Sequence, residues 1–307
     1  MASAAPSASD GQSAVPGILL VVSAIAVFSI QDVFIKLLGE DYSVLQIVFI
    51  RSLVALPIVL GITAGTIGLR DLKTERLGLN LLRGTCMMGS YTSFYIALAA
   101  LPLADAVAIA FTAPLFITAL AVPILKEPVG IRRWTAIGFG FGGAMLMIQP
   151  GFGNFHPAML LALLSALGYA LATMVTRRMG RDEPGPRITF YTMLVFLVAS
   201  GAIAPWGWVP LTDRALLMMG ACGVIAGFGH FFLAQAYRLA PATVVAPFEY
   251  SGLIWAVLLG WLVWQTLPGP AVAAGMAIIV SSGLYVLYRE RKIRPRPIVA
   301  HRPRAPI

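Results

Sequence analysis

The stretch VVAPFEYSGLIWAVLLGWLVW, residues 244–264, decides the fold class because it is long and apolar enough to cross a lipid bilayer. A hydrocarbon core of about 30 Å requires about 20 apolar residues in an α-helix. The stretch nevertheless contains the carboxylate of Glu249, two residues after Pro247. An ionisable side chain at membrane depth is costly and usually faces a cavity or another polar group. We therefore expect a membrane helix that carries a functional acid.

Comparable apolar runs recur along the whole chain. The protein has 307 residues, of which 59% are hydrophobic and 11% are charged, and its mean hydropathy is +0.85. The runs are continuous rather than alternating, which favours helices over the strands of a β-barrel. The sequence thus predicts an all-α integral membrane protein with ten transmembrane helices, at about 17–38, 43–65, 79–100, 104–124, 131–149, 157–177, 188–208, 215–237, 242–264 and 270–287.

The chain also contains an internal repeat. Residues 100–130 align without a gap with residues 238–268, which pairs Leu101 with Leu239 and Glu127 with Gln265. Each half then has five helices, and an odd number forces the second half to cross the membrane in the opposite sense. We expect two inverted five-helix repeats, with the chain divided into a disordered N-terminal tail (1–15), a first repeat (16–150), a second repeat (151–288) and a basic tail (289–307).

Basic residues indicate the orientation of the chain. Lys and Arg gather in the connections after the second, fourth, sixth and eighth helices and in the C-terminal tail, whereas the opposite side holds only Lys36 and Arg214. Lys and Arg accumulate in cytoplasmic loops, so both termini should be cytoplasmic. The net charge of +9 is spread over loops beside anionic lipid, which argues against a nucleic-acid partner.

Two segments carry a family resemblance. LPLADAVAIAFTAPLFITALAVPILKEPVGIRRWTAIGFGFGGAMLMIQPG (101–151) resembles the first half of an EamA-type permease of the drug/metabolite transporter superfamily, and AQAYRLAPATVVAPFEYSGLIWAVLLGWLVWQTLPG (234–269) resembles the second half. The resemblance implies a secondary transporter of the cell membrane that works by alternating access. It implies a small-molecule substrate resembling amino acids, riboflavin, S-adenosylmethionine or drugs. Gln265 departs from the pattern, because many relatives keep an acid there.

The depth of Glu249 follows from counting residues from the turn at 239–241. His230 and Glu249 are equidistant from that turn, so both should lie roughly 10 Å below the cytoplasmic helix ends. An acid and an imidazole at one depth can exchange a proton or hold a cationic group. The alternative is a polar pair that only locks two helices together.

Asp32 and Arg51 are likewise equidistant from the turn at 41–42. An acid and a base at one depth neutralise one another, so we expect a structural or gating ion pair. Lys36 lies one turn after Asp32 on the same face and competes as a partner.

Pro114 and Pro247 should interrupt corresponding helices of the two halves, and such breaks mark the sites of transporters with inverted repeats. The adjacent side chains become candidates for substrate binding or coupling, unless the prolines are simple kinks. Aromatic rings could complete the pocket, although each ring could instead face lipid. The candidates from both arguments are Thr112, Glu249, Tyr250, Tyr91, Tyr95 and Trp255.

The histidines and cysteines are scattered without the spacing of metal ligands, so we expect no metal and no cofactor. A nucleophile with its base is also missing from the sequence pattern, which disfavours an intramembrane enzyme. A membrane sensor or scaffold that does not transport is the other alternative. The expected partners are the lipid bilayer and a small-molecule substrate, and the sequence leaves open a coupling proton and a homodimer.

Overall fold

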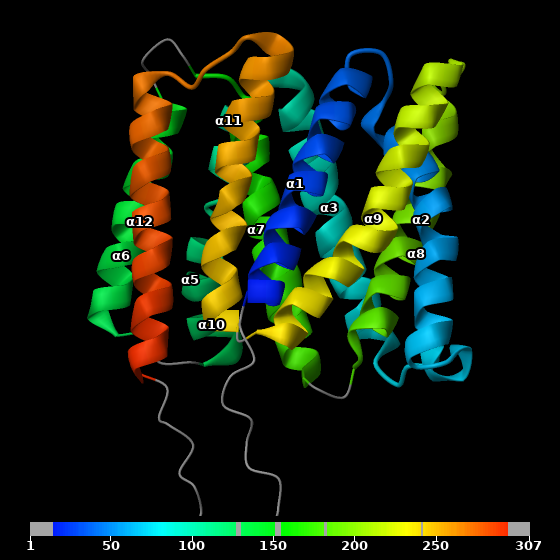
Figure 1. Cartoon of the computed structure of the whole chain (residues 1–307), viewed down its shortest axis with the longest axis horizontal. Coiled ribbons are helices and arrows are strands. Elements are labelled where there is room, and N and C mark those ends of the chain that lie inside the picture. Colours follow the sequence, from blue (N-terminus) through cyan, green and yellow to red (C-terminus); the bar gives the residue numbers. More distant parts are fainter. Residues whose placement is uncertain (1–14, 127–129, 151–154, 181–182, 241, 294–307) are drawn as a thin grey trace, which may run out of the picture.

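The computed structural model describes residues 15–126, 130–150, 155–180, 183–240 and 242–293, and every regular element in these ranges is a helix. The expected tails lie outside the described residues, apart from Val15 and the segment up to Ile293. Figure 1 shows the helices side by side in one bundle. They are α1 (Val15–Leu38), α2 (Val44–Thr66), η1 (Leu69–Leu72), α3 (Leu77–Ala100), α4 (Leu103–Ala110), α5 (Ala113–Leu125), α6 (Ile131–Ile148), α7 (Ala158–Met179), α8 (Gly185–Ile203), η3 (Ala204–Gly207), α9 (Asp213–Leu239), α10 (Ala242–Val245), η4 (Ala246–Tyr250), α11 (Ser251–Trp264) and α12 (Pro270–Ile293).

The prediction of an all-helical membrane protein is confirmed. Within the described ranges, eight helical segments are long and apolar enough to cross a membrane. α3 and α6 are also long, at 24 and 18 residues, but they are less apolar: α3 contains Arg83 together with several hydroxyl side chains, and α6 carries Arg132 and Arg133 in its first turn. The eight segments are Val15–Leu38, Val44–Thr66, Leu103–Leu125, Ala158–Met179, Gly185–Gly207, Asp213–Leu239, Ala246–Trp264 and Pro270–Arg289.

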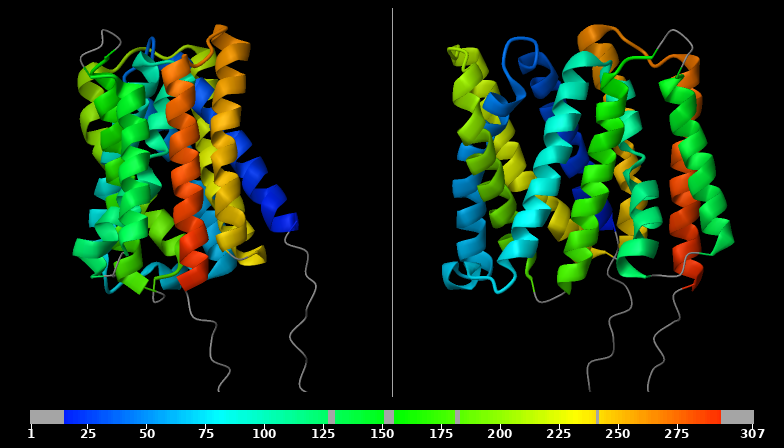
Figure 2. Two further views of the ribbon diagram at one scale, coloured as in Figure 1. Left: turned by 90° about the vertical axis from the view of Figure 1, so that its left-hand side faces the viewer. Right: turned by 180° about the vertical axis from the view of Figure 1, so that it is seen from behind.

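The helices of the two halves of the chain pack against one another in a regular pattern. α3 of the first half packs along α7 of the second, and in the same way α1 packs along α9. α2 of the first half contacts α9 of the second. The equivalent helices of the opposite halves, α8 and α3, also contact one another. Two further contacts, α2 with α8 and α6 with α12, join equivalent helices directly. Figure 2 shows the resulting intermixed bundle from the side and from behind.

Glycines bring α9 close to α2. Gly223 and Gly227 form a G-x-x-x-G pattern on α9, and a Cβ on Gly223 would lie 2.6 Å from the Cβ of Val54. A Cβ on Gly227 would lie 2.7 Å from a methyl carbon of Ile58, one turn further along α2. Lipid gives no hydrophobic drive for helices to associate, so such close van der Waals packing stabilises the pair.

Polar contacts join the two halves at both ends of the bundle. At one end, the hydroxyl of Thr74 donates to the carboxylate of Glu183 (2.5 Å), which also forms an ion pair with Arg187 (3.3 Å). At the other end, the Gln46 side chain donates to the carbonyl of Val209 (2.7 Å) and accepts from the amide of the same residue (3.0 Å). These contacts connect the first and second halves at both ends of α2.

Candidate functional site

Two helix breaks lie at equivalent positions of the repeat. Thr112 stands between α4 and α5, two residues before Pro114, and is the N-cap residue of α5. Tyr250 ends η4, three residues after Pro247, and is the N-cap residue of α11. The alignment that pairs Leu101 with Leu239 also pairs Thr112 with Tyr250. Each half therefore interrupts its fourth long helical segment at the same place.

The two breaks meet in space through a pair of aromatic rings. The ring of Phe111, the residue before Thr112, stacks on the ring of Tyr250 with centroids 5.4 Å apart and planes inclined by 30°. Thr112 is fully buried, and its hydroxyl donates to the carbonyl of Ile109 (2.7 Å). The hydroxyl of Thr112 thus satisfies a local backbone group, and the aromatic pair forms the contact between the breaks.

The carboxylate of Glu249 lies on η4 and accepts a hydrogen bond from the hydroxyl of Tyr237 on α9. Tyr169 on α7 is 43% exposed and lies within electrostatic reach of the same carboxylate. Glu249 thus has the Tyr237 phenol at hydrogen-bonding distance and the Tyr169 phenol within electrostatic reach. A carboxylate that keeps free lone pairs beside such groups can accept a cationic group or a proton.

The structure places His230 against a different partner. The His230 ring packs edge-on against Phe28 with centroids 5.3 Å apart, and its Nδ1 atom has no hydrogen-bond partner. No hydrogen bond joins His230 to Glu249 in the described part of the chain. Counting from the turn assumed an unbroken helix, whereas residues 242–250 form one α-helical turn followed by a 3₁₀ segment. The change of winding alters the direction of the Glu249 side chain and brings it to Tyr237.

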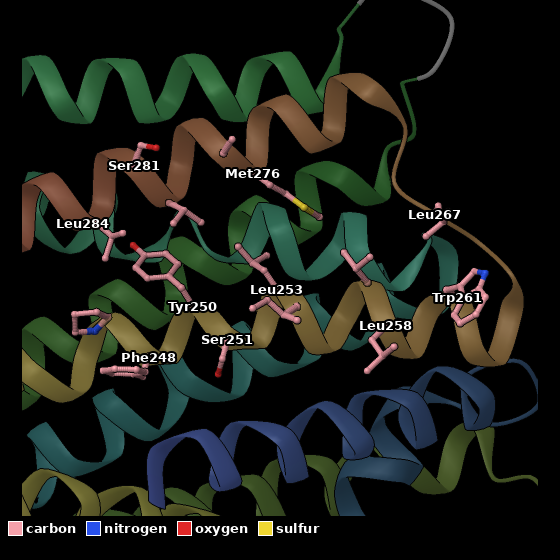
Figure 3. A pocket seen from close by; sticks show the side chains of 15 residues that line it. Phe248, Tyr250, Ser251, Leu253, Leu258, Trp261, Leu267, Met276, Ser281 and Leu284 are labelled. Atoms are coloured by element: carbon pink, nitrogen blue, oxygen red, sulfur yellow. The ribbon is translucent and has the colours of Figure 1, made fainter. Parts of the chain in front are cut away.

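Beside Tyr250, a groove of about 890 Å³ runs between α11 and α12. Figure 3 shows the Tyr250 side chain directed toward α12 at one end of the groove. A Cβ on Gly283 of α12 would lie only 1.8 Å from the Tyr250 hydroxyl oxygen, so only glycine leaves room for this ring. The lining is apolar apart from a few hydroxyls: Pro247, Phe248, Tyr250, Ser251, Leu253, Ile254, Val257, Leu258, Trp261, Leu267, Met276, Ala277, Val280, Ser281 and Leu284. Trp255 is half-buried on α11 and is outside this lining.

A second group of candidates surrounds Arg51 on α2. The guanidinium carbon lies 5.1 Å from the centroid of the Tyr91 ring and 5.9 Å from that of the Tyr95 ring, both on α3. The Tyr95 hydroxyl in turn accepts a hydrogen bond from the Gln31 amide (3.3 Å). Asp32 on α1 lies within electrostatic reach of Arg51, but the two side chains form no ion pair.

Lys36 has a separate role at the end of α3. Its ammonium donates to the carbonyls of Leu98 (2.9 Å) and Leu101 (2.6 Å) and lies 5.4 Å from the centre of the Trp264 ring. Cations at a helix C-terminus are favourable because the last carbonyls there have no intrahelical partner. Lys36 therefore caps α3 and leaves Asp32 to other groups.

Sequence reasoning missed three residues of this region, namely Tyr237, Tyr169 and Phe111. Tyr237 lies two helical turns after His230 and so shares its face of α9, which is a signal that the sequence does carry. Phe111 is paired with Glu249 by the repeat alignment, and its position next to a helix break is a second such signal. For Tyr169, only the packing of α7 in the bundle reveals its proximity to Glu249.

Comparisons with known proteins agree with this arrangement. The pattern of the EamA-like transporter family matches residues 15–149 and 156–288. An S-adenosylmethionine uptake transporter of Rickettsia prowazekii is 29% identical over 90% of this chain and 94% of its own length. A riboflavin transporter of Rhizobium johnstonii is 30% identical over 75% of this chain and 77% of its own, and a pseudopaline exporter of Pseudomonas aeruginosa is 29% identical over 86% and 93%.

A solved crystal structure of a protein 16% identical to this chain has the same fold, with a TM-score of 0.64 over 91% of this chain and 98% of the other. The family match covers both repeats and almost the whole described structure, and the similar proteins are named as transporters of small molecules. The chain therefore belongs to the EamA-like transporter family and is a multi-pass membrane transporter.

Proposed function

We propose that the protein moves a small organic metabolite across the cell membrane by alternating access, with the substrate bound between its two halves near Glu249. The observation that carries this proposal is the Glu249 carboxylate itself. It lies at a helix break inside a membrane segment, bonded to Tyr237 and next to the stacked rings of Phe111 and Tyr250. An acid at a break of this kind typically marks a substrate or ion pathway.

The architecture that fits this function has ten membrane-spanning segments in two inverted repeats, residues 16–150 and 151–288, with both termini in the cytoplasm. The paired contacts of α3 with α7 and of α1 with α9 support the repeat. The equivalent breaks at Thr112 and Tyr250 also support it. In such folds, rocking of one half against the other exposes a fixed site to each side in turn.

Compounds like S-adenosylmethionine, riboflavin or amino acids are the candidate substrates, because relatives are named as transporters of the first two. The Phe111–Tyr250 stack suits a flat ring, and Glu249 suits a cationic group or a coupling proton. Tyr91, Tyr95 and Arg51 form a second polar region of the pathway. The wall of the same pathway would include three further candidates: His230, Thr112 and Trp255.

Flux into sealed proteoliposomes tests the proposal. Purified protein should drive saturable uptake of at least one compound from a panel that includes S-adenosylmethionine, riboflavin and the common amino acids. Binding of a panel compound without any flux would favour the alternative of a sensor or scaffold. Chemical conversion of a compound would favour an enzyme. Either result would overturn the proposed transport.

A further inference from the structure

The guanidinium of Arg51 is the most unusual polar group inside the bundle. Arg51 is fully buried, and its Nε, Nη1 and Nη2 atoms all lack a hydrogen-bond partner in the described chain. The Tyr91 hydroxyl comes near the guanidinium without reaching hydrogen-bond geometry. A guanidinium carries five N–H donors and no acceptor, so the whole planar fork of Arg51 is unsatisfied.

Two other basic side chains of the same bundle, Lys36 and Arg83, have local hydrogen-bond partners. The Lys36 ammonium binds two backbone carbonyls at the end of α3. The Arg83 guanidinium on α3 donates to the hydroxyls of Thr176 and Thr192. A buried charge that has no acceptor is costly, so its retention indicates a function that requires the free donors.

The surroundings of Arg51 stabilise its charge but leave its donors free. The faces of Tyr91 and Tyr95 offer cation–π attraction to the guanidinium. Ring faces do not replace the in-plane oxygen acceptors that the N–H groups prefer. The region therefore presents a buried cation whose N–H donors are free among the described residues.

Arg51 also lies where the two halves of the chain meet. Its backbone carbonyl on α2 is covered by α9 of the second half, because a Cβ on Gly223 would lie 2.7 Å from that oxygen. Its side chain reaches toward the tyrosines of α3. Arg51 is seven residues inside α2, at a depth of roughly 10 Å from the helix start. Relative movement of the halves would change the packing of α9 on this part of α2.

We propose that Arg51 binds the carboxylate of the transported substrate, as in a compound with an amino-acid head group. A guanidinium fork matches a carboxylate in bidentate geometry, which makes Arg the preferred partner for this group. The inference rests on the proposed transport function and narrows its substrate class. S-adenosylmethionine carries such a head group, whereas riboflavin has neither a carboxylate nor an ammonium group.

The first test varies the substrate on the unchanged protein. Proteoliposome uptake is measured for S-adenosylmethionine, decarboxylated S-adenosylmethionine, riboflavin, amino acids and the corresponding decarboxylated amines. We expect every transported compound to carry the carboxylate, and its loss to weaken competition for uptake by about tenfold or more. Transport of riboflavin or an amine as efficiently as its carboxylated counterparts would overturn the inference and leave the transport function standing. Failure of the whole panel to move would overturn both.

The second test varies the protein. Arg51→Lys keeps the charge but loses the fork, so it should lower the preference for the carboxylated member of a transported pair by about tenfold. Arg83→Lys is the matched control, because Arg83 is an arginine whose donors already have partners. The control should leave this preference unchanged even if it lowers stability. An unchanged preference in a folded Arg51→Lys variant would overturn the inference, and if that variant does not fold, the substrate test decides alone.

Discussion

At the scale of single residues, Tyr250 illustrates how one glycine determines a candidate binding side chain. The tyrosine ring stacks on Phe111, and its hydroxyl occupies the space that a side chain at position 283 would fill. Gly283 is buried on α12. The geometry of the stacked pair therefore depends on the absence of a Cβ on the neighbouring helix.

We predict that Gly283→Ala will displace Tyr250 from Phe111 and raise the KM for the transported substrate by about tenfold, which corresponds to roughly 1.4 kcal/mol of binding free energy. The overall fold should persist, because the group that must move is the end of a flexible side chain. Gly142→Ala on α6 is the control, since a Cβ there meets nothing within 4 Å. Uptake kinetics in proteoliposomes provide the measurement. An unchanged KM would exclude Tyr250 from the site.

Sequence reasoning at this scale located the acid but not its partner. Glu249 was identifiable because a carboxylate inside an apolar run is conspicuous. The hydrogen bond between Glu249 and Tyr237 could not be identified from the sequence. Counting residues along an unbroken helix placed His230 at the depth of Glu249 and took no account of the 3₁₀ turn. The expected pairing of Asp32 with Arg51 met a similar limit. Equal depth fixes height in the membrane but not which way each side chain points.

At the scale of the helices, the apolar runs were sufficient to predict the helical segments, and Pro114 and Pro247 indicated the interruptions. Which helix packs on which was beyond the sequence, because the apolar residues of these helices are not confined to one face. In lipid, an apolar surface serves equally well toward a neighbour or toward acyl chains. The glycine positions carry the missing information. Gly223 and Gly227 face α2, whereas a Cβ on Gly220 of the same helix would meet nothing within 4 Å.

This difference gives a prediction for the packing of α9 on α2. Gly223→Ala should lower the free energy of unfolding by about 1–3 kcal/mol, because its Cβ would collide with the backbone carbonyl of Arg51 and force the helices apart. Gly220→Ala should be neutral or stabilising by up to about 1 kcal/mol through helix propensity. Unfolding curves in detergent distinguish the two variants. Equal effects of both substitutions would contradict the described contact.

At the scale of the whole molecule, the repeat explains why contacts between the halves come in pairs. α1 on α9 corresponds to α3 on α7, and the two breaks face one another through Phe111 and Tyr250. The alignment of residues 100–130 with 238–268 anticipated the equivalence of the breaks. It could not show that they touch, because a sequence alignment relates positions in the chain and not positions in space.

The proposed orientation is testable by labelling single cysteines in intact cells. Lys73→Cys and Gly185→Cys, near the ends of α2 and α8 that should face the cytoplasm, should resist an impermeant maleimide added outside. Gly207→Cys at the end of η3, close to Val209, which bonds to Gln46 at the start of α2, should react. Labelling of the first two variants and protection of the third would reverse the orientation.

The central claim is that this chain transports a small metabolite through a site that includes the Glu249 carboxylate. Its most direct test is uptake into sealed proteoliposomes by the wild-type protein, by Glu249→Gln and by the control Glu75→Gln, which alters an exposed carboxylate in a loop. Glutamine keeps the size of the side chain and its ability to bond with Tyr237 but abolishes its charge. We predict that Glu249→Gln, folded and inserted normally, loses transport by about tenfold or more, while the control behaves as wild type. Wild-type uptake rates in Glu249→Gln would contradict the account.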